Sequence, residues 1–304
     1  MAFAKITESG EDERATEENF DRKSHEYGRP TSIEDISNRY LIHPLSDKVV
    51  KVSMALGLSP NLLSLIGLGC GVLAAVLYFH LPQTSFVLGA FAAMIAWHIF
   101  DGADGRLARA TGKTSAFGRI IDGICDHLVF GAIYIALALH LLETGYSPSV
   151  WWLIIGAGIS HGVQAAGYEE RRQKYQRRLN GIDRDQVQEN LLTIKGKRSA
   201  VAAVYDYAQK LVAGGNYGMD QKLAILRTTA EGRPQAAYLV AQTVPMVRAW
   251  GVLNANNRTA LICIFAFIGQ PALYFAFELL VFNFVLVVLM VAEWRLEKSL
   301  IKEI

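Results

Sequence analysis

Three long windows that are almost free of charge constrain this chain more than any other feature. Residues 52–100 contain no Asp, Glu, Lys or Arg, residues 127–168 contain only Glu143, and residues 259–294 contain only Glu278 and Glu293. About 20 apolar residues cross a bilayer as a helix, so each window has room for about two crossings. The composition agrees, with 52% hydrophobic and 19% charged residues. We therefore predict an all-α integral membrane protein with six transmembrane helices, and not a soluble enzyme.

Turn residues divide these windows into expected spans. The first four are expected at about 61–79, 85–101, 117–142 and 150–168, and the last window is expected to divide near 275–280. The resulting plan has a disordered acidic tail (1–30), a juxtamembrane amphipathic segment (31–58), spans one to four (59–168), a cytoplasmic helical insertion (169–258), and spans five and six with a C-terminal tail (259–304).

The segments outside the spans have patterns of their own. Apolar residues recur at helical spacing from Ile33 to Leu56, and Pro44 is expected to break this segment into two short helices on the membrane surface. In the insertion, amphipathic helices are expected at 200–212 and 220–229, with a glycine-rich loop between them.

Basic residues predict the orientation in the membrane. The turns at 80–84 and 143–149 contain no Lys or Arg, whereas residues 169–258 contain fifteen. Because basic residues are enriched in cytoplasmic loops, we predict that both termini and the connection between the second and third spans are cytoplasmic. The membrane is expected to be the cell (inner) membrane. The basic residues are not dense enough to predict a nucleic-acid partner. The cysteines Cys70, Cys125 and Cys263 have no paired spacing, which indicates packed, reduced thiols.

Four aspartates stand where the second and third spans are joined: Asp101 and Asp104, then Asp122 and Asp126. Spacings of three and four residues put each pair on one helical face, and a hairpin of two helices would bring the four carboxylates together. Ionisable groups at membrane depth need a partner or a cation. Oxygen ligands favour hard divalent ions such as Mg²⁺ or Mn²⁺, and four acids have room for two of them.

Small and basic residues accompany the aspartates. The small residues are expected to let a bulky ligand approach the backbone, and Arg109 and Arg119 are expected to supply contacts for an anion. These small residues are Gly102, Gly105, Ala108 and Gly118. Metals, arginines and open backbone together predict a site for a pyrophosphate and for phosphoryl transfer.

The complete pattern is Asp101-x-x-Asp104-Gly105-x-x-Ala108-Arg109, eight residues, Gly118-x-x-x-Asp122-x-x-x-Asp126. Position for position it resembles the signature of the CDP-alcohol phosphotransferases (CDP-alcohol phosphatidyltransferases). Ser59-Pro60-Asn61 is similar to the Thr-Pro-Asn that these proteins often carry before the first span, with Ser in place of Thr. The resemblance covers roughly residues 33–168 and the final two spans, and the tail and the insertion have no match.

The resemblance implies a six-helix membrane enzyme of phospholipid biosynthesis, usually a homodimer, which displaces CMP from a CDP-linked donor with an alcohol. It implies that Asp126 is the general base. The implied metal ligands are Asp101, Asp104, Asp122 and Asp126. The implied contacts to the CDP donor are Asn61, Asp104, Gly105, Ala108, Arg109 and Gly118.

Two questions stay open at this stage. The donor is either CDP-diacylglycerol, with a small alcohol as acceptor, or a CDP-linked headgroup (CDP-choline or CDP-ethanolamine-like), with a lipid alcohol as acceptor. Arg119, Arg171 and Arg172 are candidates for contacts to a phosphorylated acceptor, which favours the first arrangement, although positive-inside anchoring explains them equally well. An ion or metal transporter is the alternative from another class, because intramembrane carboxylates also mark ion pathways.

Overall fold

The structure is a computed structural model that describes residues 31–113, 116–182 and 218–302, with the side chains of 116–124 left out of the description. The described residues form helices joined by turns and contain no strand. Four helical stretches are long and apolar enough to cross a membrane: Pro60–Phe79, Thr84–Ala110, Cys125–Glu143 and Pro271–Lys302. The expectation of a helical membrane protein is therefore confirmed.

The first three of these stretches are α3 (Pro60–Phe79), α4 (Thr84–Ala110) and most of α5 (Ala116–Glu143). They begin and end close to where the turn residues predict, except that α4 continues nine residues beyond Asp101, the expected end of its span. The extension matters for function because it keeps the first half of the motif helical.

Two further expected spans are helices with different properties. α6 (Val150–Asn180) is 31 residues long but is not among the stretches apolar enough to span. α12 (Ala255–Phe267) has 13 residues, about 20 Å of helix, which is shorter than a bilayer core of roughly 30 Å. Four of the six expected spans thus stand as candidate membrane helices.

The expected division of the last window near 275–280 is wrong. The chain turns instead at Gly269, which has a φ of +70°, and α13 (Pro271–Phe277) begins directly after it. A glycine in the left-handed region ends a helix and a proline in the first turn starts one. From Pro271 the helix continues through a π-helical turn, η4 (Glu278–Phe282), into α14 (Asn283–Lys302).

The expectation that Pro44 breaks the N-terminal segment is also wrong. After the short η1 (Thr31–Ile33), a π-helical turn, η2 (Asn38–Ile42), leads without interruption into α2 (His43–Ala55). Pro44 lies in the first turn of α2, where its missing N–H and its ring are tolerated, and the wider π turn before it avoids the clash that proline causes inside a regular α-helix.

The region after α6 contains a series of shorter helices. These are α9 (Gly218–Arg227), α10 (Gly232–Gln242), α11 (Val244–Trp250) and the one-turn η3 (Gly251–Leu253). α9 corresponds to the helix expected at 220–229, whereas the helix expected at 200–212 lies outside the described residues. α6 itself runs twelve residues past the expected end of the fourth span at 168, to its cap at Gly181.

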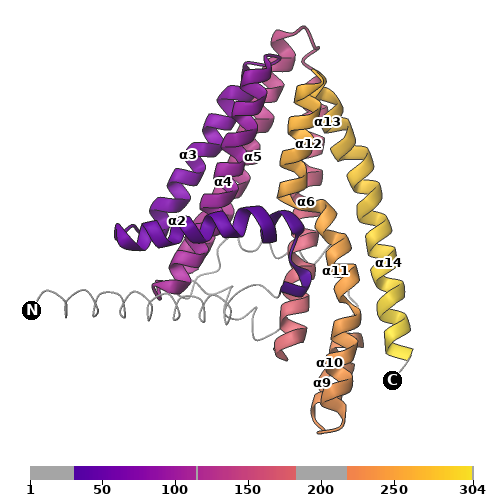
Figure 1. The fold of residues 1–304 in the computed structure, drawn as a ribbon. Coiled ribbons are helices and arrows are strands. Elements are labelled where there is room, and N and C mark those ends of the chain that lie inside the picture. The colour runs from indigo at the N-terminus through magenta and orange to yellow at the C-terminus, as the bar shows by residue number, and fades with distance from the viewer. Residues whose placement is uncertain (1–30, 114–115, 183–217, 303–304) are drawn as a thin grey trace, which may run out of the picture. The chain divides into compact units, whose positions relative to one another are not determined.

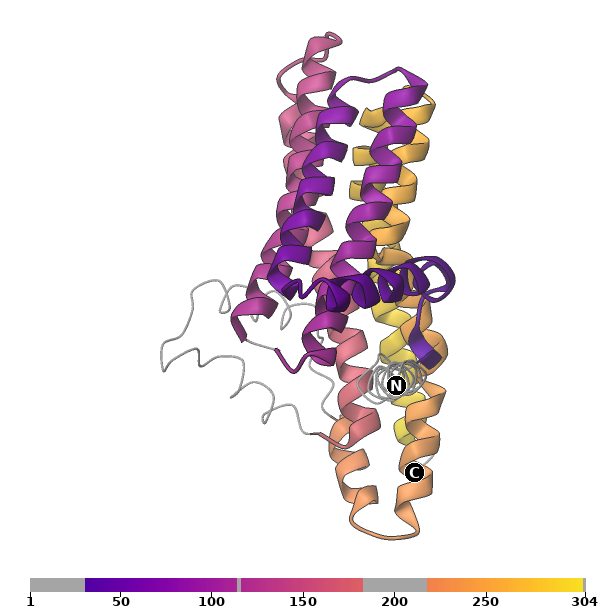
Figure 2. The same cartoon turned by 60° about the vertical axis from the view of Figure 1, so that its left-hand side comes forward.

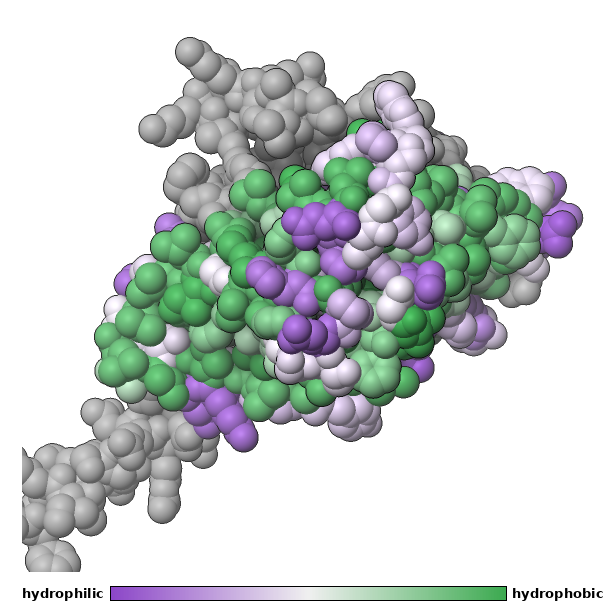
Figure 3. Space-filling model, turned by 90° about the horizontal axis from the view of Figure 1, so that it is seen from above, coloured by the Kyte–Doolittle hydropathy of each residue, from purple (hydrophilic) through white to green (hydrophobic). Residues whose placement is uncertain are grey.

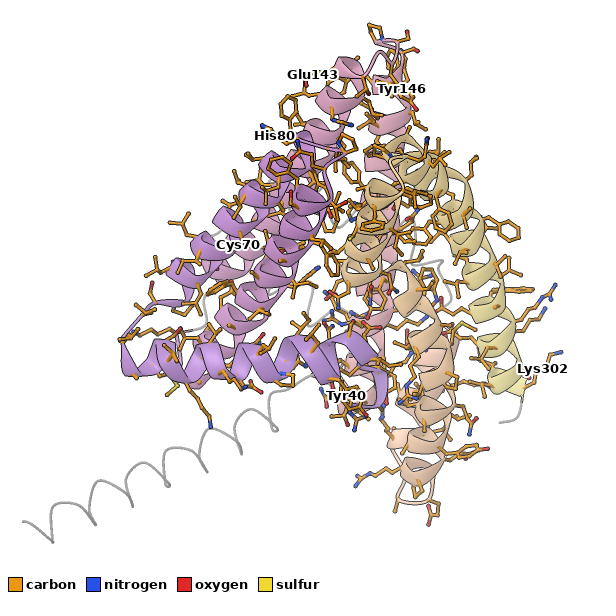
Figure 4. All side chains as sticks on the ribbon, turned by 45° about the horizontal axis from the view of Figure 1, so that its top comes forward. Tyr40, Cys70, His80, Glu143, Tyr146 and Lys302 are labelled. Carbon is orange, nitrogen blue, oxygen red and sulfur yellow. The ribbon has the colours of Figure 1, made fainter. Side chains whose placement is uncertain are left out.

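The chain divides into two compact units, Met1–Cys70 with Ile95–His127, and Gly71–Met94 with Leu128–Ile304. In the second unit, His80, Glu143 and Tyr146 lie at one end and Lys302 at the other (Figure 4). Figure 3 looks onto one end of the helices and shows apolar side chains in green with hydrophilic side chains in purple among them. In the first unit, α2 crosses the end of α4 that carries the motif (Figures 1 and 2).

Candidate functional site

Every aspartate of the motif belongs to the first unit. Asp101 and Asp104 lie on the last turns of α4, and Asp122 and Asp126 lie on the first turns of α5. The predicted helical spacing is therefore present on both helices. The turn between them begins at Gly112, which has a φ of +65°, a conformation that glycine adopts without strain.

A small pocket joins the three helices of this unit that carry the candidate residues. Ser64 and Gly67 line it from α3, Trp97, Asp101 and Asp104 from α4, and Cys125 from α5. Asp104 is buried, at 4% exposure, and Asp101 is half-buried. Two of the four predicted aspartates thus line one small, tightly packed pocket.

Gly67 allows the close approach that forms this pocket. A methyl group at Gly67 would lie 3.3 Å from Cβ of Phe100 and 3.8 Å from the backbone nitrogen of Asp101. Because a larger side chain would push the two helices apart, the glycine keeps α3 close to the backbone that carries Asp101.

Ser64 contacts a predicted site residue directly. Its hydroxyl donates a hydrogen bond to Oδ2 of Asp104, and the backbone oxygen of Pro60 is an alternative acceptor at 3.3 Å from Oγ. Hydrogen bonds to a carboxylate are stronger than those between neutral groups. Ser64 therefore orients a buried carboxylate and satisfies one of its two oxygens.

Two of the predicted nucleotide contacts on α4, Gly105 and Arg109, lie side by side. A methyl group at Gly105 would lie 3.4 Å from a terminal nitrogen of Arg109, so the guanidinium group lies beside this glycine. Arg109 is exposed and Ala108 is half-buried. Asn61 is exposed on the first turn of α3 and is not among the residues that line the pocket.

The metal ligands are only partly within the described side chains. Asp126 is half-buried and follows Cys125, a residue of the pocket wall. The side chains of Gly118, Arg119 and Asp122 lie outside the description. Among the side chains that are described, no three His, Cys, Asp or Glu residues form a group able to hold a metal ion.

The two predicted acceptor contacts on α6 belong to the second unit and are bound to carboxylates. Nε of Arg171 lies 2.8 Å from Oε2 of Glu293, and its guanidinium group stacks 4.1 Å from the ring centroid of Trp250. Arg172 pairs with Glu169 at 3.0 Å. Arg171 thus joins α6 to α14 and α11, whereas Arg172 joins neighbouring turns of α6.

Several residues of the pocket have no signal in the motif. Ser64, Gly67 and Trp97 enter it through contacts between helices, and Cys125 enters through its place beside Asp126. Ser64 and Gly67 share one face of α3 with Asn61, at spacings of three residues, and this spacing was the available signal that they belong to the site.

Comparison with known proteins agrees with this geometry. Residues 57–181 match the family described as CDP-alcohol phosphatidyltransferase. The chain is 28% identical over 125 residues to a phosphatidylinositol phosphate synthase of Mycobacteroides abscessus, which covers 41% of this chain and 48% of that protein. It is 37% identical over 93 residues to an archaetidylinositol phosphate synthase of Pyrococcus horikoshii, which covers 31% of this chain and 47% of that protein.

A phosphatidylinositol phosphate synthase of Corynebacterium glutamicum is 30% identical over 123 residues, covering 40% of this chain and 48% of that protein. The chain thus spans about half the length of the curated relatives it matches. The matched region contains the whole motif, so residues 57–181 of this chain are similar to the CDP-alcohol phosphatidyltransferase family.

Proposed function

We propose that this protein transfers the phosphatidyl group of CDP-diacylglycerol to a phosphorylated small alcohol at the membrane surface, with release of CMP. The observation that carries the proposal is the pocket between α3, α4 and α5, which is lined by Asp101 and Asp104 of the motif that matches the family. The similarity to synthases of phosphatidylinositol phosphate and archaetidylinositol phosphate supports a phosphorylated polyol, such as inositol phosphate, as the acceptor.

The donor set suits hard divalent cations. The metal ligands that the motif offers are all carboxylates. The described part of the pocket contributes two of these groups, on Asp101 and Asp104. Asp122 and Asp126 would complete the ligands. When bound, Mg²⁺ or Mn²⁺ would neutralise the negative charge of the pyrophosphate and of the leaving CMP.

The remaining chemistry falls to the side chains of the chain itself. In the transfer, the acceptor oxygen forms a bond to the phosphatidyl phosphorus while the bond from that phosphorus to the oxygen of CMP breaks. Asp126 accepts the proton of the acceptor hydroxyl, which is the role of a general base. Arg109 offers its charge to the diphosphate, and its guanidinium group lies beside Gly105.

The experiment uses the purified full-length chain in lipid vesicles with Mn²⁺ or Mg²⁺. CMP release is followed with CDP-diacylglycerol and, in turn, inositol phosphate, glycerol 3-phosphate and serine. A parallel arm supplies CDP-choline or CDP-ethanolamine with diacylglycerol. We expect CMP in the first arm, with the largest yield from a phosphorylated acceptor.

Asp101→Asn is the matched control, because it removes one charge from the pocket while keeping its size. We expect it to abolish most of the CMP release. Release of CMP in the CDP-headgroup arm alone would overturn the choice of donor. Absence of CMP from every donor would overturn the proposed function and favour a transporter.

A further inference from the structure

A contact between α2 and the motif helix is built around one buried serine. Ser46 is fully buried, and its Oγ lies 2.9 Å from the backbone oxygen of Ile42 and 2.8 Å from that of Ile99. The hydroxyl proton can be donated to either carbonyl. Ile99 is on α4, two residues before Asp101, so this hydroxyl reaches the backbone of the helix that carries the site.

Gly102 makes this approach possible. A methyl group at Gly102 would lie 2.8 Å from Oγ of Ser46, and 3.6 Å from Cβ of the same serine. The first distance is shorter than a van der Waals contact between a carbon and an oxygen atom, whereas the second is an ordinary van der Waals contact. Gly102 therefore leaves room for Ser46 of α2 beside the α4 backbone, and not for the bulky ligand that the sequence predicts.

The contact continues over the next two turns of α4. Asp47 forms an ion pair with Arg106, and Val50 packs in a cluster with Ala103 and Leu107. All three of these apolar side chains are fully buried. The α2 contact thus covers residues 99–107 of α4, the same turns that carry Asp101 and Asp104.

This arrangement allows only one rotation of α4. Successive residues of a helix are about 100° apart and rise about 1.5 Å, so a shift by one residue would turn the side chain of Asp101 or Ala103 toward Ser46. Both carry the Cβ that Gly102 lacks. Asp104, about 200° around the helix from Gly102, faces away from α2 and toward the pocket.

We propose that Ser46 is a positioning residue, and that its contact with Gly102 sets the rotation and height of the motif helix so that Asp101 and Asp104 enter the pocket. The activity readouts of this inference rest on the proposed function. The thermal midpoint of unfolding is a structural readout that does not depend on the proposed function, because the contact between Ser46 and Gly102 exists whatever the site catalyses.

A double-mutant cycle tests the proposal. Gly102→Ala forces the Ser46 hydroxyl away from the two carbonyls. Ser46→Ala removes the oxygen and leaves only ordinary contacts, at 3.6 Å from Cβ of residue 46 and 3.7 Å from Cγ2 of Ile42. We expect Gly102→Ala to lower CMP release by about tenfold to a hundredfold, the range for a small displacement of catalytic groups. In Gly102→Ala with Ser46→Ala, activity returns to the level of Ser46→Ala alone.

Gly69→Ala is the matched control. It makes the same substitution on a helix of the same unit, at a position where a methyl group would have no neighbour within 4 Å. We expect it to leave CMP release and thermal unfolding unchanged.

Two further readouts separate positioning from simple loss of folded protein. The Mn²⁺ concentration that gives half-maximal CMP release rises in Gly102→Ala and returns in the double variant, whereas loss of folded protein lowers only the maximal rate. The thermal midpoints of the four proteins in the cycle show the same rescue without any substrate.

Additive effects of the two substitutions on the thermal midpoint would show that Ser46 and Gly102 are not coupled and would overturn the proposal. Rescue of the midpoint without a change in the Mn²⁺ requirement would overturn the positioning role. If no variant, wild type included, releases CMP, the proposed function fails, while the thermal cycle still decides whether Ser46 and Gly102 are coupled.

Discussion

Replacing Ser64 by Ala removes the hydrogen bond that the Ser64 hydroxyl donates to the buried carboxylate of Asp104. A hydrogen bond to a charged group contributes about 1.5–3 kcal/mol. Since about 1.4 kcal/mol corresponds to a factor of ten, the loss is on the order of tenfold to a hundredfold in any binding that depends on this carboxylate. Loss of a residue that orients a metal ligand has an effect of the same size, about 10–100-fold in metal affinity.

The assay for Ser64→Ala is the Mn²⁺ dependence of CMP release, together with calorimetric titration of Mn²⁺ in the absence of donor. We expect the half-saturating Mn²⁺ concentration to rise in both measurements. Ser64→Thr keeps the hydroxyl and is expected to remain within about threefold of wild type, because only one methyl group is added at a half-buried position. If Ser64→Ala requires no more Mn²⁺ than wild type, Asp104 does not depend on Ser64 and the argument is refuted.

Three further substitutions test other parts of the structure. Asp126→Asn should lower the turnover number far more than the affinity for CDP, and an unchanged turnover number in steady-state kinetics would contradict its role as the base. Arg258→Met leaves the carboxylate of Glu278 without its fully buried partner and should destabilise the protein by about 3–5 kcal/mol in chemical unfolding, with partial recovery on adding Glu278→Gln. Gly71→Ala places a methyl group against the side chain of Val129 and should lower the unfolding free energy by about 1–3 kcal/mol. Equal stability of wild type and Gly71→Ala would show that α3 and α5 can move apart.

The bounds of the helices were largely predictable because the signals are local. Charge-free windows and glycine or proline turns place α3 and α5 to within a residue or two. The errors arose where a local signal has more than one structural outcome. Pro44 was expected to break a helix, but it stands where a first helical turn tolerates proline, and Gly269 ends α12 earlier than hydropathy alone indicates.

The site was predictable in its residue types but not in its contacts. Helical spacing placed Asp101 and Asp104 on one face, and the pocket contains both. No pattern in the sequence connects Asp104 to Ser64, or Gly102 to Ser46, because those contacts depend on how α2 and α3 pack against α4. Arg171 shows the same limit, since its partner Glu293 is more than a hundred residues away in the chain.

The most direct test of the central claim measures both products of one reaction. CDP-diacylglycerol and inositol phosphate are supplied to the reconstituted protein with Mn²⁺, and CMP and the new phospholipid are quantified together. Transfer of the phosphatidyl group predicts equal amounts of the two products, and none of either after chelation of the metal. CMP formed without an equal amount of phospholipid would indicate hydrolysis of the donor, and formation of neither product with any of the phosphorylated acceptors would contradict the account.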